Sequence, residues 1–255
     1  MSKKPLISII LPYHKKKKYF VSTIDSIKSQ SFKNYELILI YDDTNLDELD
    51  FVKKTLNKIN KKKIILNKKI LGPGLSRNKG ISASKGTYLA FCDADDVWSK
   101  NKLKIQIKFM IKNKLDFCHT SYYIINSKNN RIGKFNIKTK INYNDLLKSC
   151  DIGLSSVLLR KKLITKKNNF CKLRTKEDYY LWLKLIKNIK VIHGLNKELV
   201  SWRYTKGSLS DSFSQKIMDA FKLYNSYEKY NIIIALLFVL RLSFNALIKK
   251  IKIYN

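Results

Sequence analysis

The stretch Gly86-Thr-Tyr-Leu-Ala-Phe-Cys-Asp-Ala-Asp-Asp-Val-Trp98 decides the fold, because in it a short apolar strand runs directly into three carboxylates. The strand, predicted over residues 88–92, is continuously apolar, as strands covered on both faces are. The carboxyl end of such a strand is where an α/β sheet places its binding site. The anions of Asp93, Asp95 and Asp96 repel one another unless a cation joins them, and hard oxygen ligands suit Mg²⁺ or Mn²⁺ with a phosphorylated substrate.

A second interpretation of these carboxylates is a solvated turn that caps the helix expected to begin near Ser99, because Asp and Ser favour such positions. An Asp-x-Asp pattern by itself does not decide between a metal site and a cap. The organisation of the rest of the chain is therefore needed.

The segment from residue 6 to about residue 116 alternates short apolar runs with amphipathic stretches, which is the pattern of a parallel α/β sheet. We expect strands at residues 7–11, 36–41, 63–66 and 88–92, and helices at residues 20–30, 46–59 and 74–84. The first strand ends in Pro12, the second in Asp42-Asp43 and the fourth in Asp93. Because parallel strands end at one edge of their sheet, these polar residues predict a single site assembled from several strands.

The second half of the chain has a less regular pattern. It predicts strands at residues 117–126, 155–160 and 199–204, and helices at residues 142–148 and 177–187. The composition shifts near Phe213, where a helical tail begins. We therefore expect one α/β domain over residues 1–212 and a helical extension over residues 213–255.

The overall charge is strongly basic, with 52 lysines and arginines against 19 aspartates and glutamates and a formal net charge of +33. Such a balance points to anionic partners, such as nucleotide-sugar phosphates, acidic lipid head groups or RNA. The lysines are spread over the whole length and accompany many Ile and Asn residues, and all three residue types have AT-rich codons. A compositional bias of the source genome explains the charge equally well.

The cysteines, at positions 92, 118, 150 and 171, are far apart and form no Cys-x-x-Cys pair. They indicate neither a zinc site nor a disulfide framework, so a reducing cytosol is the expected compartment. The apolar run at the N-terminus is short and stops at Pro12, so we interpret it as a first strand and not as a signal peptide.

Six motifs follow one another along the chain: Ser8-Ile-Ile-Leu-Pro12, Ser26-Ile-Lys-Ser-Gln30, Tyr35-Glu-Leu-Ile to Asp42-Asp43, Gly72-Pro-Gly-Leu-Ser-Arg77-Asn-Lys-Gly80, the stretch from Gly86 to Trp98, and Lys176-Glu-Asp178-Tyr-Tyr-Leu-Trp182. With them, over about residues 6 to 210, the chain resembles the inverting nucleotide-sugar glycosyltransferases of family 2. The resemblance implies a GT-A fold, with a mixed sheet flanked by helices. It also implies metal-dependent transfer of a sugar from a nucleoside diphosphate, with UDP as the expected nucleotide.

The resemblance assigns the nucleotide to residues at the ends of the first strands. Pro12 ends the first strand, and Tyr13 is predicted to stack on the base or to lie at its edge. Asp43 is predicted to accept a hydrogen bond from the base. Arg77, in a glycine-flanked helix start, is predicted to supply a guanidinium to the nucleotide or diphosphate. The alternative for Arg77 is an ordinary surface arginine.

The same resemblance favours the metal interpretation of the acidic stretch over the cap. It makes Asp95 the direct ligand of Mn²⁺ or Mg²⁺ and places Asp93 toward the ribose or the metal. Asp96 is expected only to orient a neighbour. Ser26 and Gln30 are interpreted as structural residues.

The motif at Glu177-Asp178 implies the catalytic base. Inversion requires a group that removes a proton from the acceptor hydroxyl, and the resemblance assigns this to Asp178, with Glu177 as an orienting neighbour. The alternative is a charge pair that complements the dipole of a helix start. Trp182, one turn further on, is either a sugar-stacking face or a core residue. Arg203 resembles part of a closing loop that adds positive charge at the donor diphosphate, together with Lys206.

The tail contains nine uninterrupted apolar residues, at positions 232–240, which as a helix span about 14 Å, too short for a hydrocarbon core of about 30 Å. Arg241, Asn245, Lys249 and Lys252 then form one polar stripe at near-helical spacing. This predicts a helix lying in a membrane interface. The alternative is a helix that packs back on the domain or on a second subunit.

Together these features predict a transferase that acts on a surface glycan or a lipid-linked acceptor, in lipopolysaccharide, O-antigen or capsule assembly. The expected location is cytoplasmic, peripheral on the cytoplasmic face of the inner membrane. A nucleotidyltransferase is the alternative enzyme, but it would carry a Gly-rich loop where this chain has Pro12-Tyr-His-Lys. A basic RNA-binding protein is the alternative of another class. We expect no nucleic acid partner, because the aromatic residues fall at predicted core positions.

Overall fold

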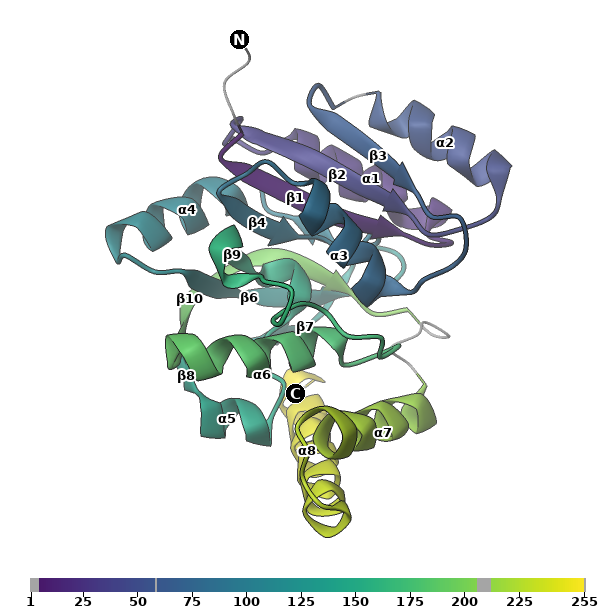
Figure 1. The fold of residues 1–255 in the computed structure, drawn as a ribbon. Helices are drawn as coiled ribbons and strands as arrows, with labels where there is room; N and C mark the ends of the chain where they lie inside the picture. The colour runs from purple at the N-terminus through teal and green to yellow at the C-terminus, as the bar shows by residue number, and fades with distance from the viewer. Residues whose placement is uncertain (1–4, 58, 206–211, 255) are drawn as a thin grey trace.

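The computed structural model describes residues 5–57, 59–205 and 212–254 (Figure 1). The first half of the chain builds β1 (Ile7–Tyr13), α1 (Lys17–Lys28), β2 (Tyr35–Tyr41), α2 (Leu46–Leu56), β3 (Lys62–Leu66), α3 (Pro73–Ala83) and β4 (Tyr88–Phe91). These are the predicted elements, with ends that move by up to three residues. The strands β3, β2, β1 and β4 are neighbours in that order and all run parallel.

Successive apolar residues of β1 enter two different cores, which explains its continuous apolar run. Ile10 packs on the face covered by α3 and α6, whereas Ile9 and Leu11 pack on the face covered by α1, α2 and α4. Ile10 is in register with Ile38 of β2 and Phe91 of β4. This register places the carboxyl ends of the three strands at one edge of the sheet.

The second half of the chain adds strands that make the sheet mixed. Its elements are β5 (Val97–Trp98), α4 (Lys102–Lys112), β6 (Phe117–Ile125), β7 (Arg131–Phe135), β8 (Lys140–Asn142), α5 (Tyr143–Lys148), β9 (Leu158–Arg160), α6 (Glu177–Ile189) and β10 (Val191–Arg203), with 3-10 turns at Leu154–Ser156 and Lys161–Leu163. The order of the sheet continues from β4 through β9, β6 and β10 to β5. β9 runs antiparallel to both of its neighbours.

Several predictions for this half were wrong in their bounds. The predicted strand at 155–160 is divided into a 3-10 turn and the short β9, and the predicted strand at 199–204 is only the end of the long β10. β7, β8 and the start of β10 were not predicted, because β7 and β10 carry many polar residues and β8 is only three residues long. β10 also has register shifts between Leu195 and Val200, which interrupt the alternation that marks a strand.

The tail forms α7 (Phe213–Lys222), a π-helical turn (Leu223–Tyr227) and α8 (Ile232–Tyr254). α8 packs on the domain through Ala235, Val239 and Leu242, which are buried. Its polar stripe also faces the domain: Arg241 and Asn245 donate to the carbonyl oxygens of Leu147 and Lys148, at 3.2 and 3.0 Å, and Lys249 binds Cys150 and Asp151. The helix therefore packs back on the domain, as the alternative interpretation predicted, but with its polar side inward.

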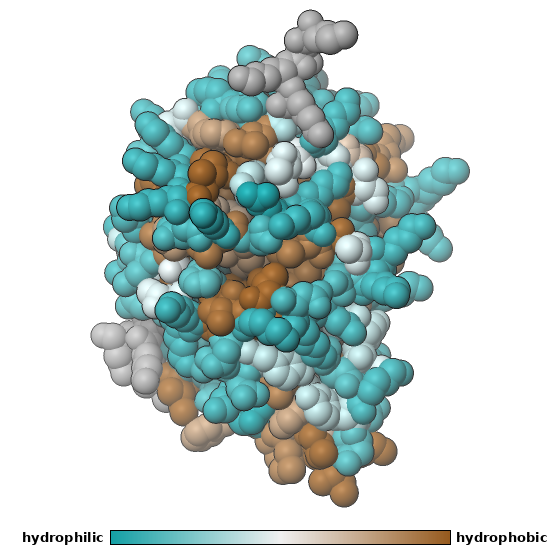
Figure 2. All heavy atoms as spheres, turned by 60° about the vertical axis from the view of Figure 1, so that its left-hand side comes forward, coloured by the Kyte–Doolittle hydropathy of each residue, from teal (hydrophilic) through white to brown (hydrophobic). Residues whose placement is uncertain are grey.

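The other side of α8 exposes a row of large apolar residues: Ile232, Ile233, Leu236, Leu237, Leu240, Phe244 and Leu247. Figure 2 shows apolar side chains at the lower end of the molecule, where the helices of the tail lie in Figure 1. By length and composition, residues 232–249 form one helix that could cross a membrane, which by itself is weak evidence. The inward polar stripe argues for a helix that lies along a surface.

Candidate active site

Arg77 connects the two acidic motifs that the sequence singled out. Its Nη2 donates to Oδ1 of Asp93 at 2.7 Å and its Nη1 donates to Oε1 of Glu177 at 2.6 Å. The side chain is 4% exposed, so the surface-arginine alternative is wrong. The guanidinium thus joins Asp93 to Glu177, which lies 100 positions after Arg77 itself. Each terminal nitrogen keeps a second N–H donor, so the predicted contact with a diphosphate stays a prediction.

The position of Arg77 depends on the start of α3. Asp42 accepts from the backbone N–H groups of Leu71 and Gly72, both at 2.8 Å, and fixes the loop that enters the helix. Gly72 has a φ of 84°, which favours glycine. At Gly74 a Cβ atom would lie 2.5 Å from the carbonyl oxygen of Cys171, so only glycine lets α3 approach the segment before α6.

Asp95 is paired with a lysine that the sequence analysis did not single out. Nζ of Lys16 lies 2.5 Å from Oδ2 of Asp95, whose side chain is 12% exposed. Burial raises the pKa of Asp95, Lys16 lowers it and Asp93 raises it again. Lys16 therefore supplies a positive charge at the carboxylate that was predicted to bind the metal.

Asp93 and Asp95 fit a divalent metal whose coordination shell is completed by the phosphates of a substrate. Within the described residues, no group of three or more His, Cys, Asp or Glu side chains is arranged to hold an ion. Mg²⁺ and similar ions bind in such sites through one or two carboxylates, with phosphates and water as the other ligands. Asp95 already attracts the Lys16 cation, and the side chain of Asp93 is 34% exposed, so both could reach a metal brought by a nucleotide.

Asp96 and Arg203 fix the loop that carries Asp95. Oδ1 of Asp96 accepts from the backbone N–H of Arg203 at 2.9 Å, which agrees with the orienting role predicted for Asp96. Nε of Arg203 donates to the carbonyl oxygen of Asp95 at 2.8 Å, and its Nη atoms donate to Asn126 and Asn129. The guanidinium also lies 4.5 Å from the ring of Tyr19.

The prediction that Arg203 adds positive charge at the donor diphosphate is therefore wrong. The residue is 3% exposed and uses its donors on the protein, so it positions the Asp95 loop and does not offer its charge to a diphosphate. Lys206, assigned to the same role, lies outside the described residues.

Asp178, the predicted base, stands at the start of α6 beside Glu177. Its Oδ1 accepts from the backbone N–H of Tyr179 at 2.7 Å, and the side chain is half-buried. Burial raises the pKa of Asp178, while Arg77 and Lys176 oppose the rise. A carboxylate with a raised pKa is a better proton acceptor, which suits a general base.

Asp43 and His14 lie at the end of the site that is predicted to bind the nucleobase. Asp43 accepts from the backbone N–H groups of Thr44 and Lys15, at 2.8 and 3.2 Å, and is 6% exposed. Nδ1 of His14 lies 3.3 Å from Oδ2 of Asp43, and the side chain of His14 is 44% exposed. Pro12 is half-buried at the same edge. The contact of Asp43 with a nucleobase stays a prediction, and His14 is a neighbour to which the sequence analysis gave no role in the site.

Two predicted contact residues are core residues. Tyr13 has no exposed surface, stacks on Tyr41 and donates its hydroxyl to Glu48 at 2.7 Å, so the predicted stacking on a base is wrong. Trp182 is also fully buried, between Phe91 and Phe117, so it is a core residue and not a sugar-stacking face. In both cases an aromatic residue next to a functional motif is buried in the core.

Ser26 and Gln30 are structural, as predicted. Oγ of Ser26 accepts from the backbone N–H of Trp98 at 3.1 Å, and the amide of Gln30 bonds Ser99 and Leu103. These contacts join α1 to the segment that follows the acidic stretch. They belong to the support of the site and not to the site.

A mixed sheet with acidic residues at one edge, next to a second carboxylate pair on α6, defines a transferase of the GT-A fold. Solved structures share this fold. S. aureus TarS 1–349 in complex with UDP-GlcNAc matches with a TM-score of 0.69 at 19% identity, over 92% of this chain and 70% of that one. The mannosyltransferase PcManGT of Pyrobaculum calidifontis, in complex with GDP-Man and Mn²⁺, matches with a TM-score of 0.69 at 10% identity, over 93% and 70%.

The chain belongs to glycosyl transferase family 2, whose model matches residues 8–167. Among curated relatives, the Escherichia coli UDP-Glc:alpha-D-GlcNAc-diphosphoundecaprenol beta-1,3-glucosyltransferase WfgD is 38% identical over 195 residues, 74% of this chain and 73% of that protein. WfaP of Escherichia coli, with the same activity in its name, is 36% identical over 210 residues, 80% of each. A putative teichuronic acid biosynthesis glycosyltransferase of Bacillus subtilis, TuaG, is 28% identical over 228 residues, 89% and 90%.

These findings confirm the predicted family, fold and glycosyltransferase class. They decide against a nucleotidyltransferase and against a basic RNA-binding protein as the primary function.

Proposed function

We propose that this protein is an inverting, metal-dependent glycosyltransferase that moves a sugar from a UDP-linked donor to a hydroxyl of a lipid-diphosphate-linked saccharide. The observation that carries the proposal is the bridge from Asp93 through Arg77 to Glu177. It holds the donor-side carboxylates and the helix start with Asp178 in one cluster. A sugar transfer by single displacement requires these two functions next to each other.

The donor side binds and orients the nucleotide. Asp43 accepts a hydrogen bond from the base, with His14 at its side. Asp95 and Asp93 would hold a Mn²⁺ or Mg²⁺ ion, which would neutralise charge on the diphosphate leaving group. Arg77 keeps Asp93 in place and adds positive charge at the same edge.

The acceptor side removes one proton. Asp178 accepts the proton of the attacking hydroxyl, and Arg77 and Glu177 hold the start of α6 against α3. Because one base acts on the hydroxyl and no second carboxylate is needed as a nucleophile, the configuration at the transferred sugar is inverted.

The choice of donor and acceptor rests on the relatives. Two of them carry UDP-Glc and a GlcNAc-diphosphoundecaprenol acceptor in their names, and they are 36% and 38% identical to this chain. TarS has been solved with UDP and with UDP-GlcNAc. We therefore assign a UDP-sugar donor and an undecaprenyl-diphosphate-linked acceptor in the assembly of a surface glycan.

The place of action is the cytoplasmic face of the membrane that holds this acceptor. The apolar side of α8 is exposed and its polar side is fixed to the domain. An apolar helix side that faces outward on a basic protein fits a membrane interface with anionic lipids.

The test is turnover of UDP-sugars by the full-length protein with a lipid-diphosphate-linked saccharide. We expect UDP release that EDTA abolishes and that Mn²⁺ or Mg²⁺ restores, and a product whose new bond has inverted configuration by NMR. Retention of configuration, or full turnover in EDTA, would contradict the proposal. An Asp95→Asn variant should keep its circular dichroism spectrum and lose turnover by about 10² or more.

A further inference from the structure

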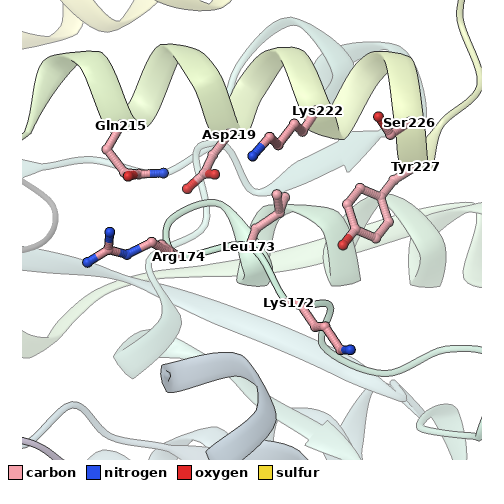
Figure 3. Close-up of a pocket in the computed structure, with 8 residues that line it drawn as sticks. All are labelled: Lys172, Leu173, Arg174, Gln215, Asp219, Lys222, Ser226 and Tyr227. Carbon is pink, nitrogen blue, oxygen red and sulfur yellow. The ribbon is translucent and has the colours of Figure 1, made fainter. Parts of the chain in front are cut away.

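A cavity of about 430 Å³ lies between α7 and the segment that leads into α6, apart from the acidic edge of the sheet. Figure 3 shows Gln215, Asp219 and Lys222 directed from α7 toward the opposite wall, where Leu173 and Arg174 lie. Lys172 and Tyr227 line it as well. Nothing in the mechanism described above uses this cavity.

The lining of the cavity is positively charged. Lys172, Arg174 and Lys222 are exposed, and within the part of the chain that the structure describes their side-chain nitrogens have no carboxylate or carbonyl partner. The one carboxylate is Asp219, which is buried and accepts from the backbone N–H and the hydroxyl of Thr175, at 2.7 and 2.9 Å. Three cations against one carboxylate give the lining a net charge of +2, with the negative charge already hydrogen-bonded.

The cavity adjoins the segment that leads into α6, the helix that carries the predicted base Asp178. Thr175, which Asp219 holds, lies three residues before Asp178, and Lys172 and Arg174 belong to the same short segment. Tyr227 lines the cavity together with Lys172 of this segment. A ligand in this cavity therefore lies next to the chain that carries the predicted base.

The other wall of the cavity leads to the apolar tail. α7 passes through the π-helical turn into α8, and the two helices pack on each other. α8 in turn carries the exposed apolar row that includes Leu240 and Phe244. One wall of the cavity therefore continues along the chain into the start of α6, and the other continues into the helix whose exposed side we assign to the membrane.

We propose that this cavity binds the diphosphate of the lipid-linked acceptor, so that the lipid extends toward α8 and the sugar toward Asp178. This inference rests on the proposed function. A diphosphate esterified at both ends carries two negative charges, which match the net charge of the lining. The Arg174 guanidinium can bind a phosphate through two N–H donors, and the two lysines add point charges.

The probe for the cavity is farnesyl diphosphate, added to the full-length protein that is saturated with UDP and Mn²⁺ to block the donor site. The variant is Lys172→Gln/Arg174→Gln/Lys222→Gln. Its matched control is Lys104→Gln/Lys108→Gln/Lys112→Gln, which removes the same charge from exposed positions on α4. We expect the cavity variant to bind the probe at least about tenfold more weakly in calorimetry, and the control to stay within about twofold of wild type.

Three results would overturn the inference: no binding of the probe to the wild type, equal binding by the cavity variant and the wild type, or equal loss in the control.

Sedimentation with phosphatidylglycerol vesicles distinguishes a diphosphate site from a head-group site. If the cavity variant loses vesicle binding as strongly as probe binding, the cavity binds lipid head groups and the inference fails. Lys222→Arg alone should retain probe binding, which guards against a folding defect.

Transfer kinetics separate this inference from the proposed function. With farnesyl-diphospho-GlcNAc as acceptor, kcat/KM of the cavity variant should fall by about tenfold or more, whereas slow transfer to octyl α-GlcNAc should stay unchanged. Equal loss with both acceptors would contradict a role toward the diphosphate. A wild type that turns over no UDP-sugar would contradict the proposed function, while the binding of the probe would still decide whether the cavity takes a diphosphate.

Discussion

Nζ of Lys16 lies 2.5 Å from Oδ2 of Asp95, so a side-chain cation occupies the carboxylate that we assign to the metal. Two cations cannot share this oxygen without repulsion. Lys16 therefore competes with a metal for Asp95.

The first prediction follows from this competition. Lys16→Ala should bind Mn²⁺ several-fold more tightly than the wild type in the absence of nucleotide, because Asp95 loses its competing partner. Electron paramagnetic resonance of free Mn²⁺ measures the affinity. Lys28→Ala, which changes an exposed lysine at the end of α1, is the control. Weaker Mn²⁺ binding by Lys16→Ala would show that the lysine supports the metal site.

A second prediction concerns Asp178. Asp178→Asn should reduce transfer by about 10² to 10⁴ and leave donor affinity nearly unchanged, since a base acts in the transition state and not on the nucleotide. Calorimetry with UDP and transfer kinetics measure the two effects. The raised pKa of Asp178 should also move the acidic limb of the kcat/KM profile above the ordinary range of an aspartate, because transfer needs the deprotonated form. Poor UDP binding by Asp178→Asn would identify a structural cap in place of a base.

The third prediction addresses the nucleobase. Asp43→Ala should weaken UDP binding by roughly 1–3 kcal/mol and affect the chemical step less, because it removes a hydrogen bond to the base. Asp50→Ala, with a side chain that is 70% exposed on α2, is the control. Unchanged UDP affinity in the Asp43 variant, with lower thermal stability, would assign Asp43 to its backbone contacts with Thr44 and Lys15 alone.

Lys102 gives a prediction about stability. It has no exposed surface, its Nζ has no hydrogen-bond partner within the described residues, and burial lowers its pKa to about 7. Between pH 7 and the ordinary value of 10.5 the unfolded chain holds a proton that the folded chain has released, so the free energy of unfolding rises with pH in this window. The full destabilisation applies below pH 7.

Lys102→Met should therefore raise the free energy of unfolding by roughly 2–4 kcal/mol at pH 7 or below, and the gain should vanish near pH 10.5. Urea unfolding of variant and wild type across this pH range measures the difference. Lys104→Met, at an exposed position of the same helix, should show no such dependence. A gain that is constant with pH would mean that packing, and not charge, causes it.

The fifth prediction tests the exposed side of α8. Leu240→Gln/Phe244→Gln should keep the fold, because both residues are exposed, and should reduce sedimentation with phosphatidylglycerol vesicles. Ile111→Gln, at an exposed apolar position on α4, is the control. Unchanged sedimentation of the double variant, together with a smaller oligomer in light scattering, would point instead to contact between two copies of the chain.

The first half of the fold could be predicted because each strand is buried on both faces. A continuous apolar run such as the one in β1 indicates a strand that is buried on both faces. Because such strands run parallel, the polar residues that follow them lie at one edge of the sheet. Asp93 was found for this reason, whereas Asp178, at the start of α6, was assigned from the family resemblance. The edge strands β7 and β8 were missed, since they are short or polar and their pairing with β6 and β10 is not visible in the local sequence.

The connections within the site could not be predicted, because they join distant residues. The Arg77–Glu177 pair spans 100 positions, and Lys16 belongs to a run of four lysines of which one reaches Asp95. The direction in which a side chain points is a second feature that the sequence did not predict. Tyr13 and Trp182 stand beside functional motifs, but their side chains point into the core, and no local pattern marked this.

The inward polar stripe of α8 has a consequence for how the protein meets its substrates. Since Arg241, Asn245 and Lys249 bind the end of α5 and the residues after it, the helix cannot roll about its own axis. If the apolar side of α8 inserts into a bilayer, every protein molecule would have the same orientation relative to the membrane. The search for an acceptor would become diffusion in two dimensions, in which encounters depend on the surface density of the lipid and not on its bulk concentration.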